Sequence, residues 1–226
     1  MSLNTILGIS ETVAINDHRF VGQMLSRNQR ISTSEILTVV PFEFTLKPMN
    51  YLRYSENRSL LTSLRIPDKA LEQYLNFGFT GWKNYITYQG DMTGGQIALC
   101  QWQTSSAGKT LVLGSLPSIS SSAYIVKAGD FCQVGRYTYI AEENVLRGTS
   151  STVNIKVHRT LLTPLTTTVA AVIGEYGTTV TMGDASYTGV TFPVILRDYP
   201  IYKLVPITND SFIEWSGEFR AFESVL

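Results

Sequence analysis

The chain has 226 residues, and its 18 Lys and Arg residues balance 18 Asp and Glu residues, which leaves a formal net charge of zero. Charged residues make up only 16% of the chain, against about 25% in an average soluble protein, and hydrophobic residues make up 44%. This composition excludes an intrinsically disordered chain and disfavours a nucleic-acid binder that depends on a net positive field. A sparsely charged surface without net repulsion favours association with other chains.

The first strands along the chain predict a long β-hairpin. Residues 19–26 and 31–46 are rich in β-branched and aromatic residues, and the polar residues 27–30 separate them. Pro41 indicates an edge position or a bulge. About ten extended residues at about 3.3 Å each span about 33 Å, so such an arm can reach a neighbouring subunit. The candidate subunit contacts on it are Phe20, Val21, Gln23, Arg27, Asn28 and Arg30.

Residues 55–77 carry the one convincing helical pattern. Ser55 can cap a first turn whose apolar side holds Leu60. Pro67 suits the first position of a second helix, which Gly78 would end. We expect two short helices, or one kinked helix, that pack an apolar stripe on a sheet.

The following segments return to short strands. Three are predicted at residues 82–89, 96–103 and 110–116. From residue 115 to about residue 174, several shorter strands alternate with turns, which is typical of a small β-barrel or sandwich set into a larger unit. Long strands are predicted again at residues 190–196, 201–205 and 212–223.

We therefore expect a mainly β fold, namely a β-sandwich with a flanking short helix that carries an inserted small β-barrel-like domain. The sandwich would comprise residues 1–114 and 175–226, with the helical segment near residues 55–77. The inserted domain would comprise residues 115–174.

One local pattern resembles a phosphate-binding loop, and two histidines could in principle bind a metal. In both cases a structural role is favoured over binding. Gly108-Lys109-Thr110 resembles the end of a phosphate-binding loop, but Gln103 stands where that loop needs glycine and a strand follows instead of a helix. His18 and His158 have no second His or Cys at metal-ligand spacing, so a structural or surface role is favoured for them.

The remaining candidates for catalysis are cysteines and carboxylates. Cys100 and Cys132 lie in apolar contexts, where buried free thiols are favoured over a disulfide, and a Cys–His pair would have to form through the fold alone. The carboxylates that could flank a glycosidic bond lie at turns, where they commonly accept main-chain hydrogen bonds: Asp91, Asp130, Glu142 and Asp184. We predict no catalytic residue, no cofactor and no metal site.

The chain shows no targeting or membrane signal. Its first eight residues lack the basic and apolar parts of a secretory signal. The most apolar later run, residues 161–173, is shorter than the roughly 20 residues that a membrane helix needs. We expect no membrane insertion, and assembly in a reducing cytoplasm.

Three stretches of the chain carry a resemblance to a known family. The first comprises residues 20–28, 41–45 and 52–58, the second residues 127–137, 145–153 and 157–159, and the third residues 212–223. They are similar to segments of virion-associated tail and baseplate proteins of contractile-tailed bacteriophages, of the distal-tail-protein type. The resemblance implies a β-sandwich with a flanking helix and an outward-facing small β-domain, and it supplies no catalytic residues.

The resemblance further implies a structural protein of the virion, assembled in the host cytoplasm. It would form a homo-oligomeric ring, hexameric by analogy, that links the tail tube to peripheral baseplate proteins, without direct sequence-specific contact to nucleic acid. An alternative is a carbohydrate-binding or host-adsorption module that stacks sugars on exposed aromatic rings. Its candidate platforms are Trp82, Tyr85, Tyr137 and Tyr139. A third hypothesis is a cell-wall hydrolase.

Overall fold

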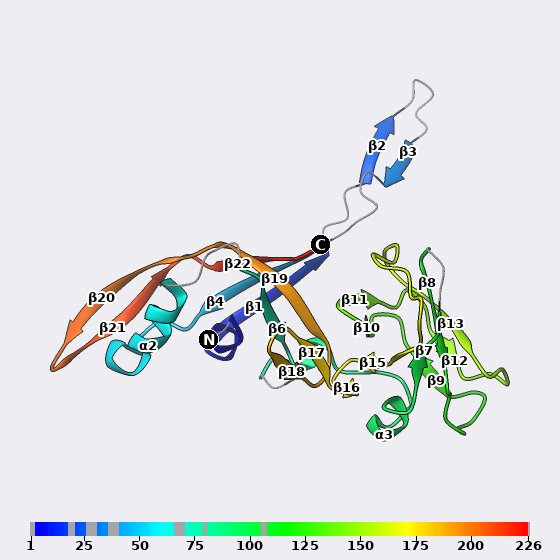
Figure 1. Cartoon of the computed structure of the whole chain (residues 1–226). Coiled ribbons are helices and arrows are strands. Elements are labelled where there is room, and N and C mark those ends of the chain that lie inside the picture. The colour runs from blue at the N-terminus through cyan, green and yellow to red at the C-terminus, as the bar shows by residue number, and fades with distance from the viewer. Residues whose placement is uncertain are drawn as a thin grey trace.

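The computed structural model describes residues 3–17, 21–25, 31–35, 41–65, 71–78, 81–104 and 108–225. The described chain is mainly β, as predicted, with several small sheets and short helices (Figure 1). Two separate clusters of buried apolar side chains give it two cores.

The first core lies under a five-stranded antiparallel sheet. Its strands, in spatial order, are β1 (Ser10–Asp17), β4 (Phe42–Pro48), β22 (Phe219–Glu223), β19 (Thr191–Asp198) and β6 (Gln73–Asn76). Helix α1 (Leu3–Gly8) packs against this sheet through buried Leu3, Ile6 and Leu7. In β4, buried residues alternate with half-buried ones, which is the period of a strand with one face on a core.

The second core lies among shorter strands. One sheet has the order β13 (Val153–Lys156), β8 (Thr110–Gly114), β7 (Gln101–Trp102) and β14 (Val169–Ala170). Another has the order β11 (Tyr137–Ile140), β10 (Phe131–Val134), β15 (Val172–Ile173) and β16 (Tyr176–Gly177). The pair β9 (Tyr124–Val126) and β12 (Val145–Leu146) and helix α3 (Gly94–Ile97) accompany them. The pair β17 (Val180–Met182) and β18 (Ala185–Tyr187) belongs instead with the first core, against which Val180 packs.

The second cluster of buried residues runs from Tyr88 to Ile173. It includes Trp102, Leu111 and Leu113, all fully buried, so strands that precede residue 115 share the apolar contacts of the segment 115–174. The expected domain boundaries stay predictions, but the packing of these three side chains places β7 and β8 with the second core.

Two hairpins project from this body (Figure 1). The strands β2 (Val21–Leu25) and β3 (Ile31–Glu35) pair only with each other. The other projection consists of β20 (Ile201–Ile207), β21 (Asp210–Ser216) and the short β5 (Leu52–Arg53), with helix α2 (Tyr54–Arg65) beside them. We call β5, α2, β20 and β21 the arm. In the chain, β20 directly follows β19 and β21 directly precedes β22, so the arm prolongs two central strands of the main sheet.

The predicted long hairpin is shorter than expected. Residues 42–48 form β4 between β1 and β22 instead of prolonging the hairpin that was predicted over residues 19–46. The reason is that Phe42, Phe44 and Leu46 are fully buried in the first core, where their alternation covers one face of the main sheet.

Three other local predictions are wrong. Residues 73–76, expected to be helical, form β6, because Leu75 and its neighbours pair with β19 and reach the core. Residues 82–89, expected as a strand, contain a short 3₁₀ helix at Lys83–Tyr85, and residues 94–97 form α3 before the two-residue β7. In each segment tertiary packing overrides a short local pattern. The expected helical start at Pro67 lies outside the described residues.

The two cores meet along β10 and β19, where Gln133 joins them. The Gln133 side chain is 1% exposed, and its Oε1 accepts the main-chain N–H of Thr191 at 2.9 Å. Its Nε2 donates to the main-chain oxygens of Thr191 and Gly135, each at 3.2 Å. The side-chain amide therefore hydrogen-bonds to main-chain groups as a neighbouring strand would, and it links strands of two different sheets.

Replacing Gln133 by Leu leaves the buried N–H of Thr191 without this acceptor. We expect the free energy of unfolding to fall by about 1–3 kcal/mol, the cost of a buried unsatisfied polar group. Urea denaturation followed by far-UV circular dichroism measures it. Gln101→Leu, at an exposed strand position, is the control, and equal midpoints for both variants would contradict the assignment.

Candidate functional site

The arm exposes an unusual amount of apolar surface. Strand β20 has the sequence Ile-Tyr-Lys-Leu-Val-Pro-Ile and only one charged residue, Lys203. Ile201 is 74% exposed and Leu204 is 44% exposed, although both are aliphatic. The exposed residues are contiguous along one strand, which is typical of an interaction surface.

The two faces of the arm differ. Leu204 is directly opposite Ile213, which is fully buried, and α2 packs against β21, so we assign α2 to the face of these two residues. On the opposite face, Val205 is directly opposite Phe212, whose ring lies 6.1 Å from that of Tyr51. Tyr51 is 67% exposed. We call the side of Val205, Phe212 and Tyr51 the open face.

The outer edge of β20 is also available for pairing. Pro206 lies opposite Ser211 and has no N–H, so this pair cannot exchange two main-chain hydrogen bonds. Because bonded pairs alternate along an antiparallel ladder, Leu204 and Pro206 turn their main-chain groups away from β21. A proline at an outward position is the usual arrangement for an edge strand.

A carboxylate at the tip of the arm holds α2 in place. Asp210 accepts the hydroxyl of Ser55 at 2.7 Å through Oδ2 and the main-chain N–H of Ser55 at 3.2 Å through Oδ1. Ser55 belongs to the first turn of α2, where free N–H groups and the helix dipole favour a negative charge. The Ser55 hydroxyl and the N–H of Ser211 lower the pKa of Asp210.

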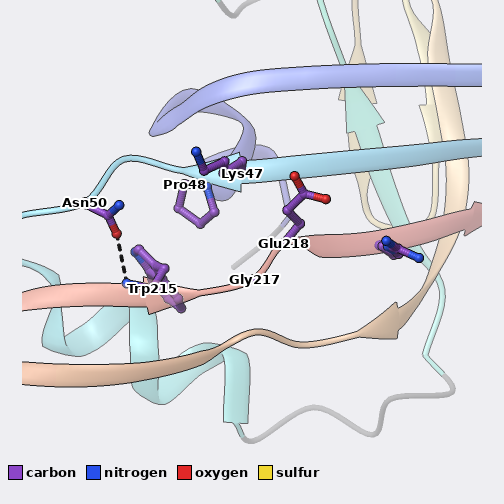
Figure 2. Close-up of a pocket in the computed structure, with 7 residues that line it drawn as sticks. Lys47, Pro48, Asn50, Trp215, Gly217 and Glu218 are labelled. Atoms are coloured by element: carbon purple, nitrogen blue, oxygen red, sulfur yellow. Dashed lines mark hydrogen bonds between the residues drawn. The ribbon is translucent and has the colours of Figure 1, made fainter.

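A hollow of about 260 Å³ lies at the root of the arm (Figure 2). Its lining residues are Lys47, Pro48, Asn50, Trp215, Gly217, Glu218 and Arg220. Oδ1 of Asn50 accepts the main-chain N–H of Trp215 at 2.9 Å, and Lys47 forms an ion pair with Glu11 at 2.5 Å. Gly217 has a φ of 110°, a conformation that favours glycine, where β21 turns into β22. The lining has no nucleophile with an adjacent base, so we interpret the hollow as part of the root of the arm.

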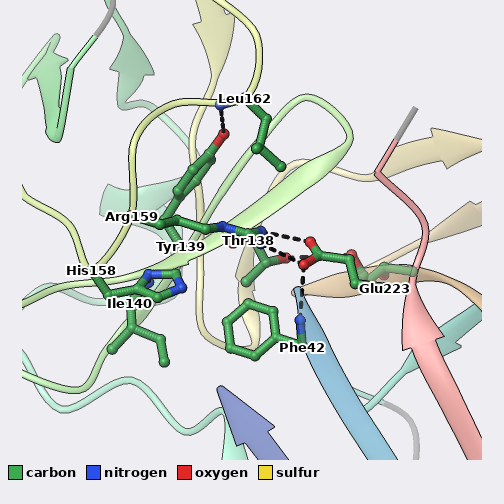
Figure 3. A network of polar contacts seen from close by, with 9 residues as sticks. Phe42, Thr138, Tyr139, Ile140, His158, Arg159, Leu162 and Glu223 are labelled. Atoms are coloured by element: carbon green, nitrogen blue, oxygen red, sulfur yellow. Dashed lines mark hydrogen bonds and ion pairs between the residues drawn. The ribbon is translucent and has the colours of Figure 1, made fainter. Parts of the chain in front are cut away.

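The second histidine belongs to a buried network between the two cores (Figure 3). His158 is 2% exposed, and its Nδ1 accepts the main-chain N–H of Ile140 at 3.0 Å. Arg159 makes two hydrogen bonds of 2.6 Å to Glu223, and both side chains are fully buried. Arg159 also donates to the carbonyl oxygen of Thr138 at 2.7 Å.

This network satisfies buried charges instead of presenting them to a substrate. Glu223 accepts the main-chain N–H of Phe42 at 3.2 Å, and the guanidinium group lies 5.1 Å from the Phe42 ring centroid. The hydroxyl of Tyr139 accepts the N–H of Leu162 at 3.0 Å. Both buried charges, the guanidinium of Arg159 and the carboxylate of Glu223, are therefore hydrogen-bonded by groups of the protein itself.

Of the other chemical candidates, Glu142 forms an ion pair with Lys156, and Asp184 is exposed. Cys100 and Cys132 are free and buried, and burial raises the pKa of the Cys100 thiol to about 11, so it is a poor nucleophile. Asp91 accepts the N–H of Tyr124 at 2.7 Å, and Asp130 accepts the N–H of Gln89 at 2.9 Å. In the described part of the chain, no group of three His, Cys, Asp or Glu residues could hold a metal ion.

The four aromatic residues proposed as sugar platforms do not form a coplanar exposed pair. Tyr137 is 4% exposed and Tyr139 is 1% exposed. The rings of Trp82 and Tyr85 are inclined by 49°, and both side chains donate to main-chain oxygens, those of Leu7 and Val13 respectively. These four residues therefore serve packing and edge contacts.

The predicted subunit contacts fall mostly outside the described part of the chain. Phe20, Arg27, Asn28, Arg30 and also His18 lie there. Val21 and Gln23 belong to β2, where they are paired with Glu35 and Thr33. The arm at residues 201–216 was predicted only as strands, although the apolar run Leu204-Val205-Pro206-Ile207 before Asn209 is a signal of an apolar edge.

The comparisons with known proteins add no family. No protein-family model matches the chain, and no curated protein matches it. Among the residues described, no helix has both the length and the apolar character that a membrane crossing requires.

The Asp210 contact predicts a pH dependence. A pKa that is lower in the folded chain stabilises the fold above the ordinary carboxyl pKa, and this stabilisation disappears as the pH falls through the folded value. We expect Ser55→Ala to raise the pKa of Asp210, measured by NMR titration of its carboxyl carbon. Ser59→Ala on the same helix is the control, and an unchanged Asp210 pKa in Ser55→Ala would refute the contact.

The buried ion pair predicts a strong asymmetry between single and double variants. Arg159→Met leaves Glu223 charged and buried, so we expect a loss of about 3–5 kcal/mol in the free energy of unfolding. Adding Glu223→Leu should restore much of that loss, because an apolar pair replaces an uncompensated charge. Chemical denaturation measures both. Lys156→Met, which breaks the exposed pair with Glu142, should cost about 1 kcal/mol or less.

Proposed function

We propose that this chain is a non-enzymatic structural protein of a bacteriophage tail or baseplate. In this proposal it forms a homo-oligomeric ring that links the tail tube to peripheral baseplate proteins, and it acts in the assembled virion. The family resemblance of the three stretches described above, which end with residues 212–223, supplies the phage context. The zero net charge and the low charge density support assembly from like subunits.

The observation that carries the proposal is the arm, which prolongs two strands of the main sheet and leaves apolar residues in solvent. A monomeric protein rarely keeps a contiguous apolar strand such as β20 exposed, because it promotes association. At the second core, the cysteines are buried, and His158, Asp91 and Asp130 bind main-chain N–H groups. An assembling subunit explains both features, whereas an enzyme explains neither.

The proposal divides contacts between the two projections. The β2–β3 hairpin, with Val21 and Gln23, stays the predicted contact within the ring. The arm is a second contact surface, separate from this hairpin. Other tail and baseplate proteins would dock on the remaining surface of the second core.

The ring predicts a specific loss when the β2–β3 hairpin is removed. Replacing residues 21–35 by a short Gly-Ser linker should abolish oligomers of more than two subunits, while the circular dichroism spectrum and melting temperature of the remaining chain change little. Native mass spectrometry and negative-stain electron microscopy of the full chain measure the assembly.

The control inserts the same linker into the exposed turn after Gly148. A wild-type chain that never exceeds two subunits, even at high concentration, would count against the ring. Release of soluble fragments from peptidoglycan by the purified chain would count against a non-enzymatic role.

A further inference from the structure

Side chains cap the edges of the main sheet, whereas no described residue caps the outer edge of β20 at Leu204. At edge strand β1, the hydroxyl of Tyr85 donates to the carbonyl oxygen of Val13 at 2.5 Å. At the opposite edge strand, β6, the side chain of Asn4 accepts the N–H of Asn76 at 2.8 Å. The described residues offer no such partner to the main chain of Leu204 in β20. Since proteins usually block long edges, an open one indicates a partner strand.

Every copy of the chain carries the same outer edge of β20, so two copies can offer this edge to each other. We take β20 of a second molecule as the partner, because β20, with seven residues, is the longest described edge strand outside the main sheet. The five-residue β2 and β3 are already assigned to the ring in the proposed function. A contact between two identical edges is twofold symmetric and antiparallel.

The residues of β20 select one register for such a pair. Centred on Leu204, the two Leu204 residues exchange both main-chain hydrogen bonds. Centred on Val205, each Leu204 would face Pro206, which has no N–H to give, so no central pair exchanges two bonds. Centred on Leu204, Pro206 faces Tyr202 of the second copy, and only these outer pairs lose one bond each. Centred on Lys203, two like charges would lie directly opposite each other, which is destabilising.

In the register centred on Leu204, the open face gains an apolar cross-strand pair at each end of the contact. Ile201 lies opposite Ile207 of the second copy, and Lys203 lies opposite Val205 of the second copy. Each Lys203 also keeps Glu214 directly opposite on its own β21. Two β20–β21–β5 sheets then form one continuous six-stranded sheet, whose open faces with Tyr51 and Phe212 lie on the same side.

We infer that two copies of this chain pair through antiparallel β20 strands centred on Leu204. The inference rests on the proposed assembly of the chain with copies of itself, and it names the second contact of that assembly. A twofold contact outside the ring joins two subunits, or two rings face to face.

Disulfide trapping tests the register in the full-length protein. In a hydrogen-bonded antiparallel pair, opposite Cα atoms are about 5.5 Å apart, within the range of about 4.4–6.8 Å that a disulfide spans. Leu204→Cys should therefore convert under mild oxidation to a covalent dimer of twice the 25.1 kDa chain mass. The native Cys100 and Cys132 are buried and do not compete.

A second pair of variants checks the direction of the strands. Ile201→Cys alone and Ile207→Cys alone should not form dimers, whereas a mixture of the two, one of them carrying a larger tag, should form only the mixed dimer. Asn209→Cys at the tip of the arm is the exposed control and should stay monomeric after oxidation.

Proline substitution tests the main-chain bonds. Leu204→Pro removes an outward N–H without removing a donor to β21, so dimers should disappear from native mass spectra. Leu204→Ala keeps the N–H and should retain the dimer. If Leu204→Pro does not fold, as judged by circular dichroism, the cysteine variants decide.

The outcomes separate this inference from the proposed function. Rings of more than two subunits without trapping of Leu204→Cys overturn the inference and leave the proposed function in place. Trapped dimers without rings support the inference and count against the ring. Self-trapping of Ile201→Cys overturns the register.

Discussion

The buried ion pair between Arg159 and Glu223 joins the two cores, and the placement of the other elements depends on it. Arg159 follows β13 of the second core, whereas Glu223 ends β22 of the main sheet. Two desolvated charges are costly unless their hydrogen-bonding groups find partners. Here Glu223 also binds the N–H of Phe42, and Arg159 also binds the carbonyl oxygen of Thr138, which restricts the geometry to one arrangement.

This arrangement has a mechanical consequence for the arm. The pair is attached to β22 and, through Phe42, to β4, and these strands are neighbours in the main sheet. Since β21 continues into β22 and β20 follows β19, a force on the arm reaches the contact between the cores through extended main chain. Asp210 and α2 stiffen the outer part of the arm, and Asn50 holds its root. A rigid projection loses little conformational entropy when it binds a partner, which favours assembly.

The apolar character of β20 is informative because it contrasts with the treatment of the other edges. Tyr85 and Asn4 cap the main sheet with side-chain hydrogen bonds, so the fold has the means to block an edge. Leaving β20 with a single lysine and a proline reduces the number of possible partners and registers without blocking the edge. Such an edge combines association with specificity.

The amino-acid sequence by itself determined the mainly β class, the extended conformation of residues 42–46, the buried free cysteines and the strand after Gly108-Lys109, because these depend on local alternation and residue type. Only the tertiary structure decided that residues 73–76 are a strand and that Arg159 meets Glu223. It also decided which face of the arm stays open. Those outcomes depend on partners far away in the chain, and a local pattern carries no information about which partner a segment will find.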